Sequence, residues 1–193
     1  MAGGESSNEP IIIIGAPSAA GKTYFSRAVA AGQVPSLTDL VQSTLGFSRR
    51  DLKSLPPRLQ DGKIHIIEIA TQRMDRYPNQ TYWANLMSHI ERAPSIILIT
   101  LEIPRSMLLK NYFFRIFSEQ RKRTSIFKRL DLPTYLRQHW RLLRYIVTNE
   151  LADAQREWER FRTSLLSQDS SHRIVCVRAV PSGSGYSITI QPR

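Results

Sequence analysis

The chain has 193 residues, a length that suits one domain with its own hydrophobic core. Hydrophobic residues make up 41% of the chain and charged residues 22%, as is typical of globular proteins. No apolar run approaches the roughly 20 residues that a membrane-spanning helix needs, so we expect no transmembrane segment.

The N-terminus, MAGGESSNEP, has neither the basic start nor the apolar segment of a secretory signal. We therefore expect a disordered tail at residues 1–9 and a single domain over residues 10–193. The one cysteine, Cys176, excludes an internal disulfide bond, and a reducing, cytoplasmic location is the simplest assumption. Because Cys176 lies in the apolar run IVCV, we interpret it as a packed core thiol rather than a nucleophile.

The formal net charge is +11, which predicts attraction to polyanions such as nucleotides, nucleic acid, acidic sugars or anionic lipid surfaces. The positive charge is concentrated in one segment. Residues 105–144 contain eleven lysines and arginines but only two acidic residues, Glu119 and Asp131. The charge does not identify which anionic partner binds, but it indicates that residues 105–144 are the part of the chain that contacts it.

The first half of the chain alternates between apolar runs and helical patterns. Residues 11–14 form a continuous β-branched run, which predicts a strand covered on both faces in a parallel sheet. Residues 21–31 predict a helix, and residues 35–39 a short loop or strand edge. Residues 40–55 predict a partly helical segment that the following proline pair ends, and residues 64–70 predict the second clear strand.

The second half of the chain continues this alternation and ends in two strands. The expected elements are a helix at 80–92, a strand at 95–103, a helix at 105–118, a polar basic break at 121–128, one long amphipathic helix or two in series from 133 to 165, and strands at 173–180 and 186–190. The repeated order of strand and helix predicts a layered α/β fold with a mostly parallel central sheet.

One segment matches a phosphate-binding pattern between the first predicted strand and the first predicted helix. It consists of Ala16, Pro17, Ser18, Ala19, Ala20, Gly21, Lys22 and Thr23. This is the Walker A pattern, with alanine in the first position where glycine is more usual. Backbone N–H groups of such a loop surround the β-phosphate, and the positive end of the helix dipole faces the anion. Gly21 lets the backbone approach closely, Lys22 reaches the β- and γ-phosphates, and the Thr23 hydroxyl is a magnesium ligand.

The segment IIIIGAPSAAGKT resembles the start of the P-loop NTPase superfamily, and its loop resembles that of guanylate-kinase-like and other small phosphotransferases. In size and in the order of its parts, the whole chain resembles a small P-loop kinase. The resemblance implies a three-layer P-loop fold that binds ATP or another nucleoside triphosphate with Mg²⁺. It also implies that the basic segment at about residues 105–130 is an arginine-bearing lid that closes over the phosphates.

Three acidic residues are candidates for chemistry beside the loop. Glu68 lies in an apolar run, where a carboxylate needs a cation or good hydrogen bonds to offset its desolvation. We favour a magnesium-binding role for Glu68 over a strand-end residue that reaches solvent or a structural ion pair, and Glu102 is a weaker rival. The resemblance to small kinases implies that Asp39, which follows the first predicted helix, is a candidate substrate-binding or base carboxylate, with a helix N-cap as the alternative.

Three arginines of the basic segment, Arg115, Arg121 and Arg123, are candidates to neutralise charge on a transferred phosphoryl group, and a solvated basic face is the alternative. Four aromatic residues lie among the basic ones: Tyr112, Phe113, Phe114 and Phe117. They offer a stacking surface for single-stranded nucleic acid, although their helical spacing favours packing against the core. The four histidines show no metal-ligand spacing.

These features predict an ATP-dependent phosphotransferase that moves the γ-phosphate to an anionic or hydroxyl-bearing acceptor. Positioning and charge neutralisation would do most of the catalysis, through Lys22, magnesium and the lid arginines. The alternative is an NTP-dependent ATPase or switch protein that binds nucleic acid or another polyanion through the basic segment. A kinase consumes ATP in proportion to a phosphorylated product, whereas the alternative shows polymer-stimulated hydrolysis or binding alone.

Overall fold

The computed structural model describes residues 10–41, 45–59, 62–123, 132–148, 150–168, 173–183 and 185–192. Six strands form one sheet: β1 (Ile11–Ala16), β2 (Phe47–Asp51), β3 (Ile64–Ala70), β4 (Ile96–Leu101), β5 (Ile174–Ser182) and β6 (Gly185–Gln191). Their order in the sheet is β2-β3-β1-β4-β5-β6. All neighbouring strands are parallel except β5 and β6, which form an antiparallel hairpin.

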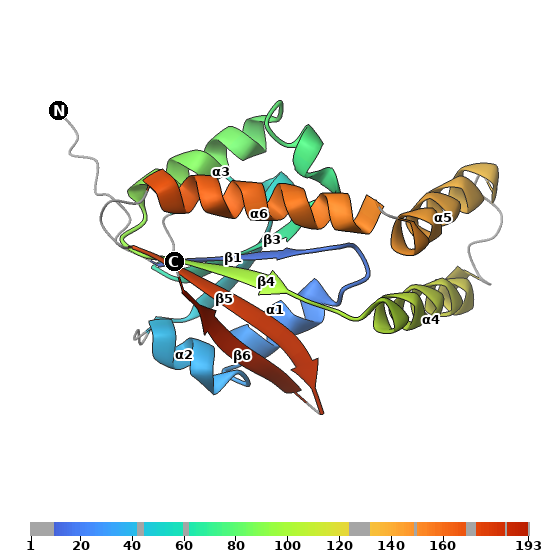
Figure 1. Ribbon diagram of the computed structural model, residues 1–193, viewed down its shortest axis with the longest axis horizontal. Coiled ribbons are helices and arrows are strands. Elements are labelled where there is room, and N and C mark those ends of the chain that lie inside the picture. The colour runs from blue at the N-terminus through green and yellow to red at the C-terminus, as the bar shows by residue number, and fades with distance from the viewer. Residues whose placement is uncertain are drawn as a thin grey trace.

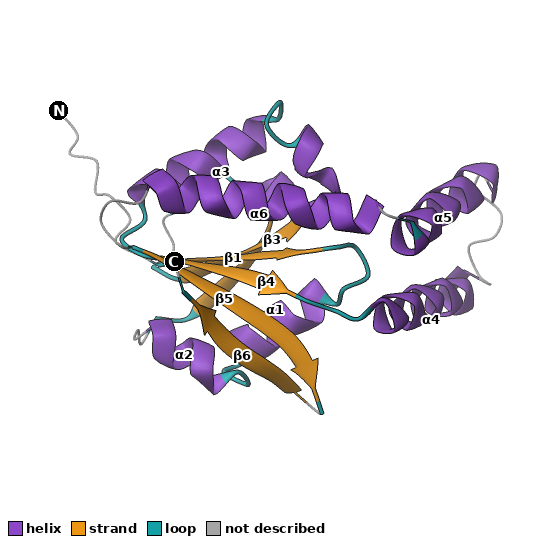
Figure 2. Ribbon diagram, viewed as in Figure 1, coloured by secondary structure: helices purple, strands orange, loops and turns teal. Residues whose placement is uncertain are grey.

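Helices cover both faces of this sheet. They are α1 (Lys22–Ala30), α2 (Pro35–Val41), α3 (Thr81–Arg92), α4 (Arg105–Arg123), α5 (Leu132–Val147) and α6 (Glu150–Gln168), with short 3-10 helices η1 (Leu52–Ser54) and η2 (Thr71–Arg76). Figure 1 shows α1 and α2 on one face and α3 and α6 on the other, so the fold has three layers. The neighbouring helices α4 and α5 lie beyond the carboxyl end of β4 (Figures 1 and 2).

The central strand β1 is buried on both faces, as its unbroken run of isoleucines predicts. Ile12 and Ile14 belong to the core beneath α1 and α2, whereas Ile11 and Ile13 belong to the core beneath α3 and α6. The two cores follow the alternation of side chains along a strand. The α/β class and the mostly parallel sheet predicted from the sequence are therefore confirmed.

Gly15 on β1 is required by the packing of α6. A β-carbon at this position would lie 2.4–2.5 Å from three atoms of the Trp158 indole ring, closer than carbon atoms approach one another. Trp158 is 1% exposed, and its Nε1–H donates a hydrogen bond of 2.8 Å to Thr100 Oγ1 on β4. The glycine therefore lets α6 seat a large aromatic ring directly on the central strand.

The predictions for residues 35–55 were wrong. The loop expected at 35–39 is the helix α2, which begins with Pro35 and buries Leu37 and Val41 one turn apart. Proline suits the first helical position, because its missing N–H is not needed there. The helix expected within 40–55 is largely replaced by β2, whose sequence FSRRD lacks an apolar pattern. Backbone pairing with β3 at the edge of the sheet makes it a strand.

The predictions for the second half were closer. The amphipathic stretch forms two helices in series, α5 and α6, and two of its apolar positions, Trp140 and Val147, are exposed rather than packed. Helix α4 continues to Arg123, so the first part of the expected break is helical. The rest of that break and the expected N-terminal tail lie outside the described residues. Among the helices that the structure describes, none is both long and apolar enough to cross a bilayer.

Candidate functional site

The loop between β1 and α1 lies at the carboxyl edge of the parallel strands. From β1 the chain leads through α1 and α2 to β2, whereas from β4 it leads through α4, α5 and α6 to β5, on the other side of β1. The connections that leave the adjacent strands β1 and β4 thus run to opposite sides of the sheet. Open α/β sheets bind ligands outside the carboxyl ends of their strands at such a point. The topology therefore directs attention to the loop at residues 17–21.

Two residues of this loop have a left-handed backbone conformation. Gly21 has φ 77°, and a β-carbon there would meet no atom within 4 Å, so the conformation rather than lack of space favours glycine. Ala19 has φ 67°, which is uncommon for a residue with a side chain and stores backbone strain. Helix α4 contacts this strained position, since Asn111 Nδ2 donates a hydrogen bond of 3.1 Å to the Ala19 carbonyl.

The loop is also tied to the segment that follows β3. The Ser18 N–H donates to Gln72 Oε1 at 3.0 Å, and Gln72 Nε2 donates back to the Ser18 hydroxyl. The Lys22 side chain folds back over the loop, where its ammonium group donates to the carbonyl oxygens of Ala16 at 2.9 Å and Pro17 at 2.8 Å. The loop backbone and the lysine charge are thus held together at the start of α1.

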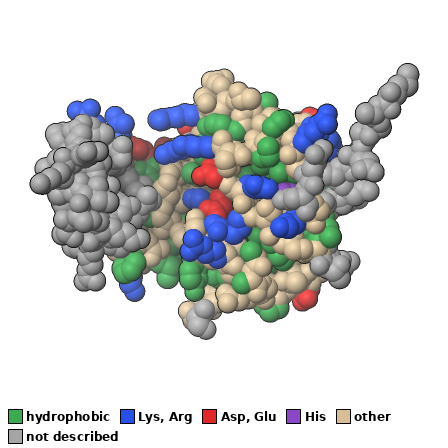
Figure 3. All heavy atoms as spheres, turned by 180° about the vertical axis from the view of Figure 1, so that it is seen from behind, with side chains coloured by type: hydrophobic (Ala, Val, Ile, Leu, Met, Phe, Trp, Pro, Cys, Tyr) green, Lys and Arg blue, Asp and Glu red, His purple; other side chains and the backbone are tan. Residues whose placement is uncertain are grey.

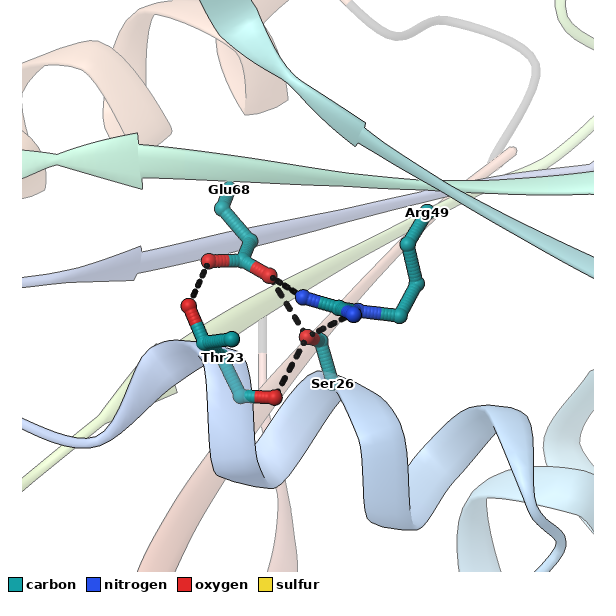
Figure 4. Close-up of polar contacts among 4 residues, drawn as sticks. All are labelled: Thr23, Ser26, Arg49 and Glu68. Carbon is teal, nitrogen blue, oxygen red and sulfur yellow. Dashed lines mark hydrogen bonds and ion pairs between the residues drawn. The ribbon is translucent and has the colours of Figure 1, made fainter.

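The predicted magnesium residues, Thr23 and Glu68, contact each other directly. The Thr23 hydroxyl on α1 donates a hydrogen bond of 2.9 Å to Glu68 Oε2 on β3 (Figure 4). The other carboxylate oxygen, Oε1, accepts from Ser26 Oγ at 2.6 Å and from Arg49 Nη2 on β2 at 2.8 Å. Arg49 Nε in turn donates to Ser26 Oγ at 2.7 Å. Four side chains from α1, β2 and β3 therefore form one polar cluster.

This cluster keeps Glu68 ionised. Burial alone raises the pKa of a carboxyl group, but hydrogen bonds from Ser26, Arg49 and Thr23 and the positive charge of Arg49 outweigh it. As a result, the pKa of Glu68 lies below its ordinary value of 4.5. The Glu68 side chain is only 16% exposed, so the carboxylate is partly shielded from water. The structural ion pair considered from the sequence is present here, and it involves Arg49.

The donor set fits a magnesium ion better than a softer metal. Thr23 Oγ1 and Glu68 Oε2 are hard oxygen donors on adjacent elements, and Mg²⁺ prefers such donors. Within the described residues, no group of three or more histidine, cysteine or acidic side chains is placed to hold a metal. In proteins Mg²⁺ often binds one or two carboxylates and takes its remaining ligands from water and phosphate.

Two other acidic candidates lie apart from this cluster. Asp39 is an exposed residue of α2, which lies at the far end of α1 from the loop (Figure 1), so the structure does not bring it to Glu68. It is the fifth residue of α2 and does not cap that helix, so the N-cap alternative was wrong. Glu102 follows β4 and forms an ion pair of 2.5 Å with Arg178 on β5. Of these three acidic candidates, Glu68 is the one that hydrogen-bonds a residue of the segment 16–23 in the part of the chain that the structure describes.

The lid candidates Arg115, Arg121 and Arg123 all belong to α4 by their backbone, and their side chains are outside what the structure describes. Sequence reasoning missed four residues that contact the loop or Glu68: Ser26, Arg49, Gln72 and Asn111. Gln72 had a usable signal, because it follows β3 by two residues and so emerges at the same sheet edge as the loop. The others depend on packing between elements that are distant in sequence.

Comparison of the chain with models of known protein families, with curated proteins and with solved structures found no match. The fold and the site therefore describe the molecule by themselves. It is an α/β protein with a six-stranded, mostly parallel sheet and a cluster of ionised and hydroxyl side chains at the carboxyl edge of β1 and β3.

Proposed function

We propose that this chain binds ATP or another nucleoside triphosphate with Mg²⁺ at residues 16–23 and transfers the γ-phosphate to a hydroxyl or phosphate acceptor. The observation that carries the proposal is the contact between Thr23 and Glu68 beside Lys22. The loop, the start of α1 and Glu68 on β3 thus bring together a positive charge, a helix N-terminus and two oxygen atoms that suit magnesium. Triphosphate binding needs these three features together.

Each residue of the segment has a defined part in this proposal. Backbone N–H groups of the loop and the N-terminus of α1 hold phosphate oxygens. The Lys22 ammonium exchanges its loop carbonyls for phosphate oxygens, which are stronger acceptors because they are charged. Thr23 and Glu68 hold Mg²⁺, directly or through water, and the ion supplies charge neutralisation of the phosphates when it is bound.

The Arg49–Ser26 pair has a positioning role. Both side chains bond Glu68 Oε1, which leaves Oε2 directed at Thr23. A carboxylate held in this way does not need to reorient when a cation binds, so less free energy is lost to ordering. The arginines at 115, 121 and 123 remain candidates for the lid, because α4 already contacts the loop through Asn111. Asp39 has no part in the proposal, since its helix α2 lies at the far end of α1 from the loop (Figure 1).

Replacing the lysine of the loop tests the nucleotide site. Lys22→Ala removes the point charge on the phosphates, and we expect a loss of ATP affinity of tenfold or more in the presence of Mg²⁺. Isothermal titration calorimetry measures the affinity, and circular dichroism checks that the fold is retained. Lys63→Ala is a matched control, because Lys63 is an exposed lysine outside the loop. Unchanged ATP binding in Lys22→Ala, or an equal loss in Lys63→Ala, would refute the site.

Product analysis separates the kinase from the NTP-dependent binding protein considered above. ATP consumption is measured across acceptor classes, namely sugars, nucleosides, nucleotides and oligonucleotides, with a search for the phosphorylated acceptor in each case. A phosphorylated product in proportion to ADP supports phosphotransfer. Hydrolysis stimulated by a polymer without any phosphorylated product assigns the site to the alternative.

A further inference from the structure

One face of α5 combines arginines with an exposed tryptophan. Arg137, Trp140, Arg141 and Arg144 recur at the spacing of three and four residues that brings side chains to one side of a helix. All four are exposed, and Trp140 is 66% exposed. We call these four residues the α5 basic face. Ile146, on the opposite side of the helix, and Tyr145, at the edge between the two sides, are buried in the core.

The charge of the α5 basic face is only partly balanced. Arg144 forms an ion pair of 2.6 Å with Glu150 at the start of α6. In the part of the chain that the structure describes, no acidic side chain pairs with Arg137 or Arg141. Outside residues 105–144 the basic and acidic residues of the chain nearly balance. Figure 3 accordingly shows basic side chains interleaved with acidic ones on the back of the molecule.

The exposed tryptophan narrows the choice of polyanion. A large aromatic ring in water is costly, and a flat ring between guanidinium groups offers a stacking platform to a nucleobase. In a duplex the bases are stacked inside, so Trp140 would find no free base face. A membrane-surface helix presents a broad apolar face to lipid, whereas three of the four residues of the α5 basic face are arginines, and Tyr145 and Ile146 are buried in the protein. The chemistry of the α5 basic face thus fits unpaired bases joined by phosphates.

We infer that the α5 basic face is a docking surface for single-stranded nucleic acid. Arg137 and Arg141 contact backbone phosphates, where the planar guanidinium matches the phosphate oxygens. Trp140 stacks on a base between them. The two arginines are one helical turn apart, about 6 Å along the axis, so the surface engages a short stretch of strand. The inference goes beyond the proposed function and does not depend on nucleotide binding at the loop.

The test measures oligonucleotide binding by the full chain without ATP or Mg²⁺. Fluorescence anisotropy of a labelled thymidine oligomer of about 20 nucleotides gives the affinity at several salt concentrations. We expect Arg137→Ala and Arg141→Ala each to weaken binding and to reduce the slope of log K against log salt by about 0.7, because one fewer counterion is released. Trp140→Ala should weaken binding about fivefold or more and leave the slope unchanged, because stacking releases no counterion.

Matched controls distinguish binding at the α5 basic face from nonspecific attraction of the oligonucleotide to positive charge elsewhere on the protein. Arg156 and Arg160 are exposed arginines of α6 that form ion pairs with Asp153 and Glu157, so Arg156→Ala and Arg160→Ala remove the same charge at another place. Tyr24, which is 69% exposed on α1 and lies outside the basic segment, is the aromatic control, as Tyr24→Ala. Equal losses in these controls, or no oligonucleotide binding by the wild type, would overturn the inference. Binding to phosphatidylserine vesicles that depends on Trp140, without oligonucleotide binding, would assign the surface to lipid instead.

Discussion

At the scale of single residues, the carboxylate of Glu68 has different partners on its two oxygens. Oε1 is held by Ser26 and Arg49, and Oε2 meets only Thr23 among the hydrogen bonds of the described residues. The arrangement suits a group that keeps one oxygen fixed and offers the other to a cation.

Removing the charge of Glu68 is expected to weaken the response to magnesium. Glu68→Gln keeps the size of the side chain and an acceptor oxygen, but it loses the negative charge that attracts the ion. We expect the Mg²⁺ concentration needed for half-maximal ATP binding to rise by tenfold or more, with the fold retained. Titration of Mg²⁺ at fixed ATP measures this shift.

Glu102→Gln is the control for this prediction. Glu102 is also a carboxylate next to a strand end and is also paired with an arginine, but it lies beside β5 rather than beside the loop. Its replacement should leave the Mg²⁺ response unchanged. If the two variants shift the midpoint equally, or if neither does, Glu68 is a structural ion-pair residue and the metal role is lost.

At the scale of elements, the packing of α6 against β1 can be tested by replacing Gly15, which contacts Trp158 of α6. In Gly15→Ala the new β-carbon would lie 2.4–2.5 Å from the Trp158 ring, so the ring or the helix must shift. Overpacking of this kind lowers the free energy of unfolding by about 1–3 kcal/mol. Chemical denaturation measures the loss.

Two further variants define the cause of that loss. Gly46→Ala adds the same methyl group where no atom lies within 4 Å, so its stability should change by a few tenths of a kcal/mol at most. Adding Trp158→Phe to Gly15→Ala removes part of the ring, so the two changes should cost less together than the sum of the single ones. Additive costs would show that the contact between the two residues is not the source of the strain.

The elements that could be predicted from the sequence are those in which the spacing of apolar residues matches the periodicity of the strand or helix that they form. The isoleucine run of β1 and the alternation of strand and helix patterns that follows it indicated the α/β class, and the pattern Gly21-Lys22-Thr23 where α1 begins indicated the position of the loop. Strand β2 could not be found, because its polar sequence is paired only through its backbone with β3. Its Arg49 was missed for the same reason, since its contact with Glu68 spans 19 residues of sequence.

At the scale of the whole molecule, two titrating groups of the described residues, which lie in separate places, contribute to stability in acid. His89 on α3 is 3% exposed, and its Nε2 lies 2.7 Å from the Pro56 carbonyl, which joins α3 to the segment after β2. Burial lowers the pKa of His89, the hydrogen bond to Pro56 partly opposes this, and the charge of Arg92 lowers it further. The net result is a pKa below the ordinary value of 6.5. Glu68 is the second group, with its pKa below 4.5.

These two groups predict a loss of stability in two steps as the pH falls. For His89, the unfolded chain takes up a proton below pH 6.5 that the folded protein resists, so stability is complete above 6.5 and falls as the pH passes through the folded pKa. For Glu68, the corresponding loss begins only below pH 4.5. Urea unfolding midpoints measured across both pH ranges should therefore fall first between pH 6.5 and 4.5.

His89→Gln keeps an N–H donor but cannot titrate, so it should reduce the first fall in stability and leave the second unchanged. Glu68→Gln should reduce the second fall and leave the first unchanged. If the wild-type midpoint stays constant between pH 6.5 and 4.5, or if His89→Gln leaves the fall unchanged, protonation of His89 is not the cause of the first loss of stability.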